Sequence, residues 1–356
     1  MSQSEQLPAV GPDLFRSAAD DVAELWLQPV PLPIPSGIAP LDRALDGGFL
    51  PESLAVLCAG TGRGKSGLVV QIALGWLAQG RSVLFIETEM SKRQTLARFL
   101  AQRMRQPWRE IFNRGPQSTD ELSKVAQRDL RGLYIVRWQR SQDIGQILES
   151  CPQSPSGPPL VILDQLSDLA RALLLADMRI ATARVTGDLK RFAEKHRTVI
   201  LAVSQTARTV TADHRKRRSG RDFEGASKDA GEVEADAASL LYLDSEPCPR
   251  NGAAKAKIHV SKSRWSPCNE VVELLFHGAH GTFEPVAAEQ HARDHQETLD
   301  AIKLLGCPVG VKRLAGHLKI GQANAEKRLA ALQIGGLIVR SEHGISLAVT
   351  GDSACR

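Results

Sequence analysis

The residues best suited to chemistry lie between positions 52 and 66, in the sequence ESLAVLCAGTGRGKS. An apolar stretch over 53–58 leads into a glycine-rich loop that ends in Gly64, Lys65 and Ser66. Glycines let a backbone close around a phosphate, a lysine ammonium binds the β- and γ-phosphates, and the next hydroxyl ligates Mg²⁺. This order of residue types predicts a P-loop that binds a nucleoside triphosphate together with Mg²⁺.

The predicted nucleotide-binding loop departs from the pattern G-x-x-x-x-G-K-[ST] at its first position, where Ala59 stands. Alanine is the smallest side chain after glycine, so we expect the turn still to close. An ordinary glycine turn between a strand and a helix is the alternative, and the Lys–Ser pair in register disfavours it. The candidate nucleotide-binding residues are Gly60, Thr61, Gly62, Arg63, Gly64, Lys65 and Ser66.

A P-loop needs a carboxylate beside the Mg²⁺ ion, and residues 160–164 (LVILD) form an apolar strand that ends in one. We expect Asp164 to face the P-loop across the sheet and to share the metal with Ser66. A buried strand with a capping aspartate is the alternative.

A second carboxylate is needed to orient the attacking water, and the strand over 82–87 runs into Glu87 and Glu89. Residues two apart on an extended backbone face the same side, so both glutamates are candidates. Either could instead cap the helix that begins near Ser91.

These residues are positioned by strands and helices that alternate from Gly37 to about Pro285. Apolar strands alternating with amphipathic helices predict an α/β fold, with a mostly parallel sheet covered on both faces. We predict further strands at 238–244, 255–263 and 269–277, which have only loops between them and are expected to be antiparallel additions at one edge. The preceding strands are predicted at 52–58, 82–87, 132–138, 159–164 and 198–204, and the helices at 65–79, 91–105, 118–128, 141–150 and 170–196.

Two smaller regions flank the ATPase-like region, which we place at 37–285. Residues 1–36 form an N-terminal arm and proline-rich linker, with an amphipathic helix over 12–27 that packs on its own domain or docks on a neighbouring subunit. Residues 286–293 are expected to be a junction. Residues 294–350 predict a winged helix-turn-helix domain, with helices near 295–305, 309–318 and 321–334 and a hairpin over 337–349.

Composition excludes several classes of protein. Of the 356 residues, 42% are hydrophobic and 24% charged, as in soluble globular proteins. No run approaches the ~20 apolar residues of a membrane span, and no secretory signal opens the chain, so no membrane partner is expected. The six cysteines show no C-x-x-C spacing, which fits a cytoplasmic protein without disulfides or a cysteine metal site. A net charge of +5 permits a nucleic-acid partner without requiring one.

The order of the motifs resembles the RecA-type motor domain of the DnaB family of replicative helicases, which is close to the RecA, KaiC and RadA ATPases. The similarity spans residues about 34–285. The residues that carry it, besides the P-loop and the strand ending in Asp164, are a leader over 34–49, FIETEMS over 85–91 (family FSLEMP), Ser204–Gln205 (SQL), GEVEADA over 231–237 (GSIEQDAD) and Lys262-Ser263-Arg264 (K-x-R).

The resemblance implies roles for single residues. Glu89 would be the catalytic glutamate, with Glu87 as its neighbour, and Gln205 would sense the γ-phosphate of ATP. Lys262 and Arg264 would reach the nucleotide of the next subunit. A finger supplied in trans implies a homo-oligomer, expected to be a hexamer, with ATP and Mg²⁺ as cofactors.

A basic run in the loop after Gln205 is the predicted contact with nucleic acid. Charge runs are often only solvated surface, but in the DnaB family the corresponding loops line the central channel and hold single-stranded DNA. The family's R-E-S-G resembles residues 228–231, although the first three positions differ. The candidate contacts are Arg215, Lys216, Arg217, Arg218, Arg221, Lys228 and Gly231.

Two functions remain open at this stage. The basic loop and the K-x-R spacing favour an ATP-driven DNA helicase or translocase that serves replication of a mobile element. Two features favour a KaiC/RadA-like regulatory or recombination ATPase instead. Only about thirty residues precede the motor region, too few for the family's collar domain, and a C-terminal domain is added. That domain is expected to bind duplex DNA or a protein, with candidate contacts at Gln322, Asn324, Lys327 and Arg328.

Overall fold

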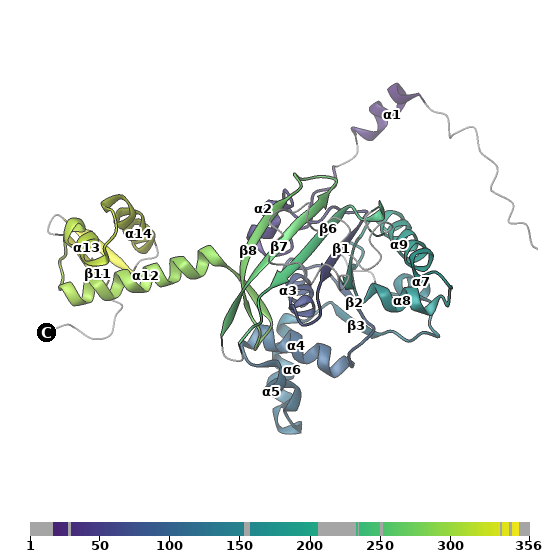
Figure 1. The fold of residues 1–356 in the computed structure, drawn as a ribbon, viewed down its shortest axis with the longest axis horizontal. Coiled ribbons are helices and arrows are strands. Elements are labelled where there is room, and N and C mark those ends of the chain that lie inside the picture. The colour runs from purple at the N-terminus through teal and green to yellow at the C-terminus, as the bar shows by residue number, and fades with distance from the viewer. Residues whose placement is uncertain are drawn as a thin grey trace, which may run out of the picture.

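The computed structural model describes residues 17–27, 30–152, 157–205, 233, 235–249, 252–334, 337–341 and 344–348. Its main feature is a nine-stranded sheet in the order β3-β2-β4-β5-β1-β6-β7-β8-β9 (Figure 1). The strands are β1 (Ser53–Ala59), β2 (Val83–Glu87), β3 (Leu133–Arg137), β4 (Leu160–Asp164), β5 (Val199–Gln205), β6 (Ser239–Ser245), β7 (Ala253–Ser263), β8 (Glu270–His277) and β9 (Thr282–Pro285).

The first six strands along the chain are parallel, and β7, β8 and β9 add antiparallel pairs at one edge. This confirms the predicted α/β class with a mostly parallel sheet and antiparallel edge strands. The prediction for β6 was wrong, because β6 pairs parallel to β1. The chain between β5 and β6 is long enough for a crossover, which a parallel pair requires. The four-residue strand β9 was not predicted.

The helices cover both faces of the sheet (Figure 1). The predicted helix over 170–196 is two helices, since the chain turns between them at Leu174, whose φ is 52°. The short helices α2 and α5 were not predicted. The helices of this unit are α2 (Ala39–Ala44), α3 (Lys65–Ala78), α4 (Lys92–Met104), α5 (Trp108–Asn113), α6 (Thr119–Asp129), α7 (Ile144–Glu149), α8 (Leu166–Ala172) and α9 (Met178–Lys195), with a 3-10 turn η2 (Pro116–Ser118).

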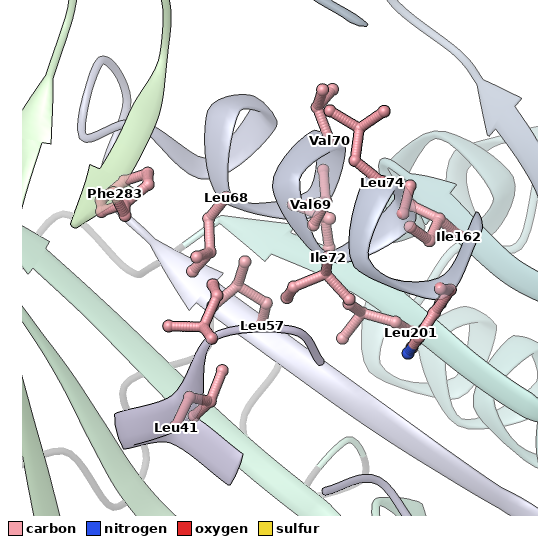
Figure 2. Packing of buried hydrophobic residues seen from close by; sticks show 14 of the residues in the cluster. Leu41, Leu57, Leu68, Val69, Val70, Ile72, Leu74, Ile162, Leu201 and Phe283 are labelled. Carbon is pink, nitrogen blue, oxygen red and sulfur yellow. The ribbon is translucent and has the colours of Figure 1, made fainter. Parts of the chain in front are cut away.

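Two apolar cores lie on the two faces of the sheet, and β1 contributes to both. Ala55 and Leu57 join the core formed with α3 and α4 (Figure 2), whereas Leu54 and Val56 join the core formed with α8 and α9. Successive side chains of a strand point to opposite faces, so an unbroken apolar run is what a strand covered on both sides needs. The central strand that leads into the P-loop is therefore fixed from both sides.

The C-terminal region has a core of its own. Helix α12 (Val286–Leu305) leads to α13 (Val311–Leu318), α14 (Gln322–Ile334) and the hairpin of β10 (Ile338–Ser341) and β11 (Gly344–Leu347). Ile302, Leu314 and Leu329 are among its fully buried side chains. The predicted junction over 286–293 is helical, because α12 begins directly after β9. Three helices and a hairpin are present, and their assignment as a winged helix stays a prediction.

Helix α1 (Ala18–Leu25) lies within the predicted helix over 12–27 and projects from the sheet (Figure 1). Ser17 caps it by accepting the amide N–H of Asp20, and Val22, Leu25 and Trp26 are all more than half exposed. Among the described residues, no helix is both long enough and apolar enough to cross a lipid bilayer.

Candidate nucleotide site

The P-loop joins the end of β1 to the start of α3. Gly64 is the N-cap of α3, with φ at 87°, and a Cβ added there would lie 2.9 Å from Phe283 Cζ. Only glycine fits such a position, because both the backbone conformation and the packing exclude a side chain. Ala59 is the last residue of β1, in register with Gln205 and Leu243, so an extended backbone accommodates the one departure from the motif.

Lys65 and Ser66 project from the first turn of α3. The Lys65 ammonium donates to the carbonyls of Ala59 (3.1 Å) and Gly60 (3.2 Å), folding back over the loop. Burial lowers the pKa of Lys65, while the charges of Asp164 and Glu89 act in the opposite direction. These two carboxylates therefore lie close enough to influence the lysine.

Asp164 ends β4 and lies against the P-loop. The Ser66 hydroxyl donates to Asp164 Oδ2 at 3.1 Å, so the two predicted Mg²⁺ ligands are neighbours. Burial, reinforced by the charge of Glu87, raises the pKa of Asp164 to about 7. An approaching divalent cation would favour the ionised carboxylate, since opposite charge stabilises it.

The two glutamates after β2 have different environments. Glu87 is fully buried, and its carboxylate accepts the amide N–H groups of Glu89 and Met90, both at 2.9 Å, and the Thr95 hydroxyl at 3.2 Å. Burial raises the pKa of Glu87 in spite of these bonds. Glu89 is exposed, and its carboxylate accepts the side-chain amide of Gln165 at 2.9 Å. Glu87 holds the turn, and Glu89 is left open to the site.

A polar bridge joins the ends of β2 and β4, and sequence reasoning did not predict it. The Thr88 hydroxyl donates to Asp168 at 2.6 Å and accepts the Gln165 amide N–H at 2.9 Å, while the Thr88 amide donates to the Asp164 carbonyl at 2.8 Å. This bridge fixes the loops that present Glu89 and Asp164. The only available signal was that polar residues follow both strands.

Gln205 ends β5, directly opposite Ala59 in the register of β5 with β1, so its backbone lies beside the P-loop. The nucleic-acid contacts predicted in the loop beyond it, namely Arg215, Lys216, Arg217, Arg218, Arg221, Lys228 and Gly231, lie outside the described residues.

The structure does not bring Lys262 and Arg264 to the P-loop of their own chain. Lys262 is paired with Leu240, which is in register with Val56 at the middle of β1. The Arg264 amide donates to the carbonyl of Ala238, whose own amide donates to the carbonyl of Leu54 near the start of β1. The P-loop instead follows the last residue of β1, at the other end of the strand. Both cations donate to the carbonyl of Ala235, Arg264 at 3.0 Å and Lys262 at 3.5 Å. We call the surface formed by Lys262, Arg264 and Trp265, at the end of β7, the cation edge.

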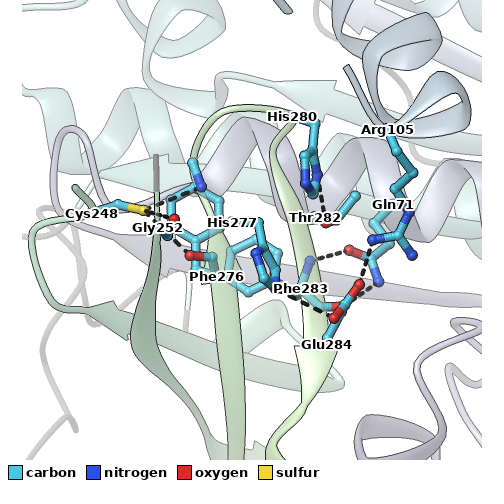
Figure 3. Close-up of polar contacts among 11 residues, drawn as sticks. Gln71, Arg105, Cys248, Gly252, Phe276, His277, His280, Thr282, Phe283 and Glu284 are labelled. Carbon is cyan, nitrogen blue, oxygen red and sulfur yellow. Dashed lines mark hydrogen bonds and ion pairs between the residues drawn. The ribbon is translucent and has the colours of Figure 1, made fainter. Parts of the chain in front are cut away.

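The hairpin of β8 and β9 covers α3, which the sequence did not predict. The Gln71 side chain donates to the Phe283 carbonyl at 2.8 Å and accepts the Phe283 amide at 2.6 Å (Figure 3). The Gln102 amide donates to the carbonyls of Gly67 (2.8 Å) and Gly281 (2.6 Å). Helix α3 is thus joined to the strand that leads into α12.

In the C-terminal region, the candidate contacts on α14 differ in their environment. Arg328 donates to Asp294 (2.8 Å) and Glu297 (2.9 Å) on α12, so it fixes the packing of the two helices. Gln322 and Asn324 are exposed. The side chain of Lys327 lies outside the described residues.

The sequence model of the DnaB-like helicase C-terminal domain matches residues 33–285. The "Probable plasmid replicative DNA helicase" of Chlamydia psittaci is 26% identical over 220 residues, covering 60% of this chain and 47% of that protein. The replicative DNA helicase DnaB of Haemophilus influenzae is 24% identical over 275 residues, which cover 73% of this chain and 57% of that protein. The DNA repair protein RadA of Mycobacterium tuberculosis is 42% identical over 62 residues, 17% of this chain and 13% of that one.

Among solved structures, the ATPase domain of G40P superposes with a TM-score of 0.62 at 20% identity, covering 76% of this chain and 99% of that domain. A DnaB-like replicative helicase, solved in a study of its interactions with primase, superposes with a TM-score of 0.59 at 20% identity. The match covers 76% of this chain and 67% of that one. At this identity the likeness establishes the fold alone, and the chain spans about half the length of the curated relatives it matches. Since the family match takes in the whole nine-stranded unit with its P-loop, the chain belongs to the DnaB-like helicase C-terminal domain family.

Proposed function

We propose that this protein is an ATP-driven DNA helicase or translocase that hydrolyses ATP between subunits arranged head to tail. The observation that carries the proposal is the position of two functional groups on one sheet. The P-loop lies at the carboxyl ends of the parallel strands, whereas Lys262 lies level with the middle of β1 and Arg264 with its start. A subunit of this design completes the site of a neighbour and not its own.

Within one subunit, the described residues fit Mg²⁺–ATP. The amides of residues 60–64 and the Lys65 ammonium would bind the phosphates, and a Cβ at Gly62 would meet nothing within 4 Å, so the tip of the loop is open. Ser66 and Asp164 offer two adjacent oxygens, the ligand type that Mg²⁺ prefers. The bound ion would neutralise charge on the phosphate oxygens.

Glu89 is the group that we propose orients the attacking water. It is exposed at the site, whereas the carboxylate of Glu87 is engaged by two backbone amides. The bond from Gln165 fixes one oxygen of Glu89 and leaves the other available to accept a proton from water. Gln205, beside the P-loop, would sense the γ-phosphate and pass its state to the loop that follows.

Single-stranded DNA is the proposed track, held by the basic loop that begins after Gln205. The four consecutive cations at 215–218 suit a phosphate backbone, and their place after the proposed sensor links nucleotide state to DNA contact. A ring, with a hexamer as the expected form, would enclose the strand. The C-terminal region would bind duplex DNA or a protein. The similarity to a plasmid replicative helicase supports a role in the replication of a mobile element.

A strand-displacement assay on a forked duplex with ATP and Mg²⁺ tests the proposal, with Lys65→Ala as the inactive control. Unwinding by the wild type and none by the variant is the expected result. DNA-stimulated hydrolysis without unwinding would instead support a regulatory or recombination ATPase, the alternative favoured by the local similarity to RadA.

A further inference from the structure

A compact turn at the end of β7 carries two residues of the cation edge, Arg264 and Trp265. The Ser263 hydroxyl oxygen accepts the amide N–H groups of Trp265 (3.2 Å) and Ser266 (2.9 Å), and the Ser266 hydroxyl lies 2.9 Å from it. The Ser263 amide in turn donates to Cys268 Sγ at 3.4 Å. Four contacts from a single residue make this turn a defined structure, and it presents the two residues between Ser263 and Ser266 outward.

Those two residues are a cation and an indole. Arg264 is exposed, and Trp265 is 52% exposed although Ser266 beside it is buried. Arg264 is oriented by the carbonyl of Ala235, so its direction is also set by the fold. Tryptophan is the side chain most enriched at the energetic centres of protein interfaces, and arginine is among the next. A rigid turn that presents both has the composition of an interface and not of ordinary surface.

The opposite side of the same sheet has the complementary charge. At the end of β2 the carboxylate of Glu89 is exposed, and the phosphates of a bound nucleotide would add to this negative charge. A surface that complements a different surface of the same molecule generates a head-to-tail assembly, either a ring or a filament. The partner that fits the cation edge is therefore a second copy of this chain.

We propose that Trp265 is the apolar anchor with which each subunit holds the P-loop side of the next copy, so that Arg264 is delivered to the neighbour's nucleotide. This inference rests on the proposed function and adds a residue that the K-x-R motif does not contain. The indole buries apolar surface on assembly, while the cations supply orientation and charge. Binding and catalysis are thereby divided between two adjacent residues.

The test compares Trp265→Ala and Trp265→Phe with the wild type by sedimentation velocity over a range of protein concentrations, with ATP and Mg²⁺ present. Ile180→Ala, which alters an exposed apolar residue on α9, is the matched control. We expect the alanine variant to need at least about 10-fold more protein for half-assembly, since interface anchors cost that much or more. The phenylalanine variant should fall between, and the control should match the wild type.

Hydrolysis per subunit separates the anchor from the catalytic cation. Trp265→Ala should recover the wild-type rate at high protein concentration, whereas Arg264→Ala should assemble normally and remain inactive at every concentration. Unchanged assembly of Trp265→Ala with an inactive Arg264→Ala would overturn the anchor and leave the proposed function standing. A wild type that stays monomeric would overturn both. Unchanged assembly with lost binding of single-stranded DNA would assign Trp265 to base stacking instead.

Discussion

The head-to-tail arrangement predicts that two inactive variants restore activity to each other. Lys65→Ala removes the phosphate-binding cation but keeps the cation edge, and Arg264→Ala does the reverse. Lys262, two residues before Arg264, lies level with Val56, three residues from the end of β1, which is roughly 10 Å along the strand. The P-loop begins beyond that point, so Arg264 cannot serve its own site.

The magnitude follows from counting sites. Each variant alone should hydrolyse ATP about 10³-fold or more slowly than the wild type, the range measured for arginine fingers. In a random equal mixture, a productive site needs its P-loop from an Arg264→Ala subunit and its finger from a Lys65→Ala subunit. About one site in four meets this condition, so activity should rise toward a quarter of the wild-type value.

The assay is steady-state release of phosphate with saturating ATP, Mg²⁺ and single-stranded DNA, after the two variants have been mixed at low concentration and allowed to assemble. A double variant that carries both substitutions, mixed with the wild type, is the control for subunit exchange. If exchange occurs and the mixture of single variants stays inactive, the reasoning from the sheet register is refuted.

Three further predictions concern single residues. Glu89→Gln should lower kcat by about 10²–10⁴ with ATP binding retained, measured by titration with a fluorescent nucleotide. Glu87→Ala should instead lower the melting temperature, because it removes the oxygen that accepts two backbone amides. Asp164 has a folded-state pKa of about 7, above its value of 3.8 when unfolded. Ionising Asp164 therefore destabilises the folded protein. This penalty is absent below pH 4, grows as the pH rises and is complete above pH 7. Asp164→Asn should therefore stabilise the nucleotide-free protein at pH 8, by at most roughly 4 kcal/mol, and hardly at all at pH 4; an equal gain in melts at both pH values would contradict this. Neutralising the cations at 215–218 should weaken binding of single-stranded DNA and flatten its dependence on salt, and an unchanged slope would remove that loop from the interface.

The fold could be predicted as far as local pattern determines it. The run over 53–58 had to be a strand buried on both faces, and the strand-to-helix order had to give a parallel sheet. Local pattern does not give the neighbour of a strand, so the direction of β6 was predicted wrongly. The division of the helix over 170–196 was missed because its apolar spacing continues across the turn at Leu174.

The chemistry of the site was determined by the sequence alone, because a P-loop is a continuous segment whose residue types and spacing carry its function. Lys65 and Ser66 need only the end of one strand and the start of one helix. The same holds for Asp164 as the acid at the end of an apolar strand.

What only the tertiary structure decided was the environment of each group. Glu87 and Glu89 are equivalent in the sequence, and the amides that turn back onto Glu87 leave Glu89 to the site. The place of Lys262 and Arg264 away from the P-loop follows from the register of β7 with β6. Such differences arise from contacts between residues far apart in the chain, which spacing along the sequence does not encode.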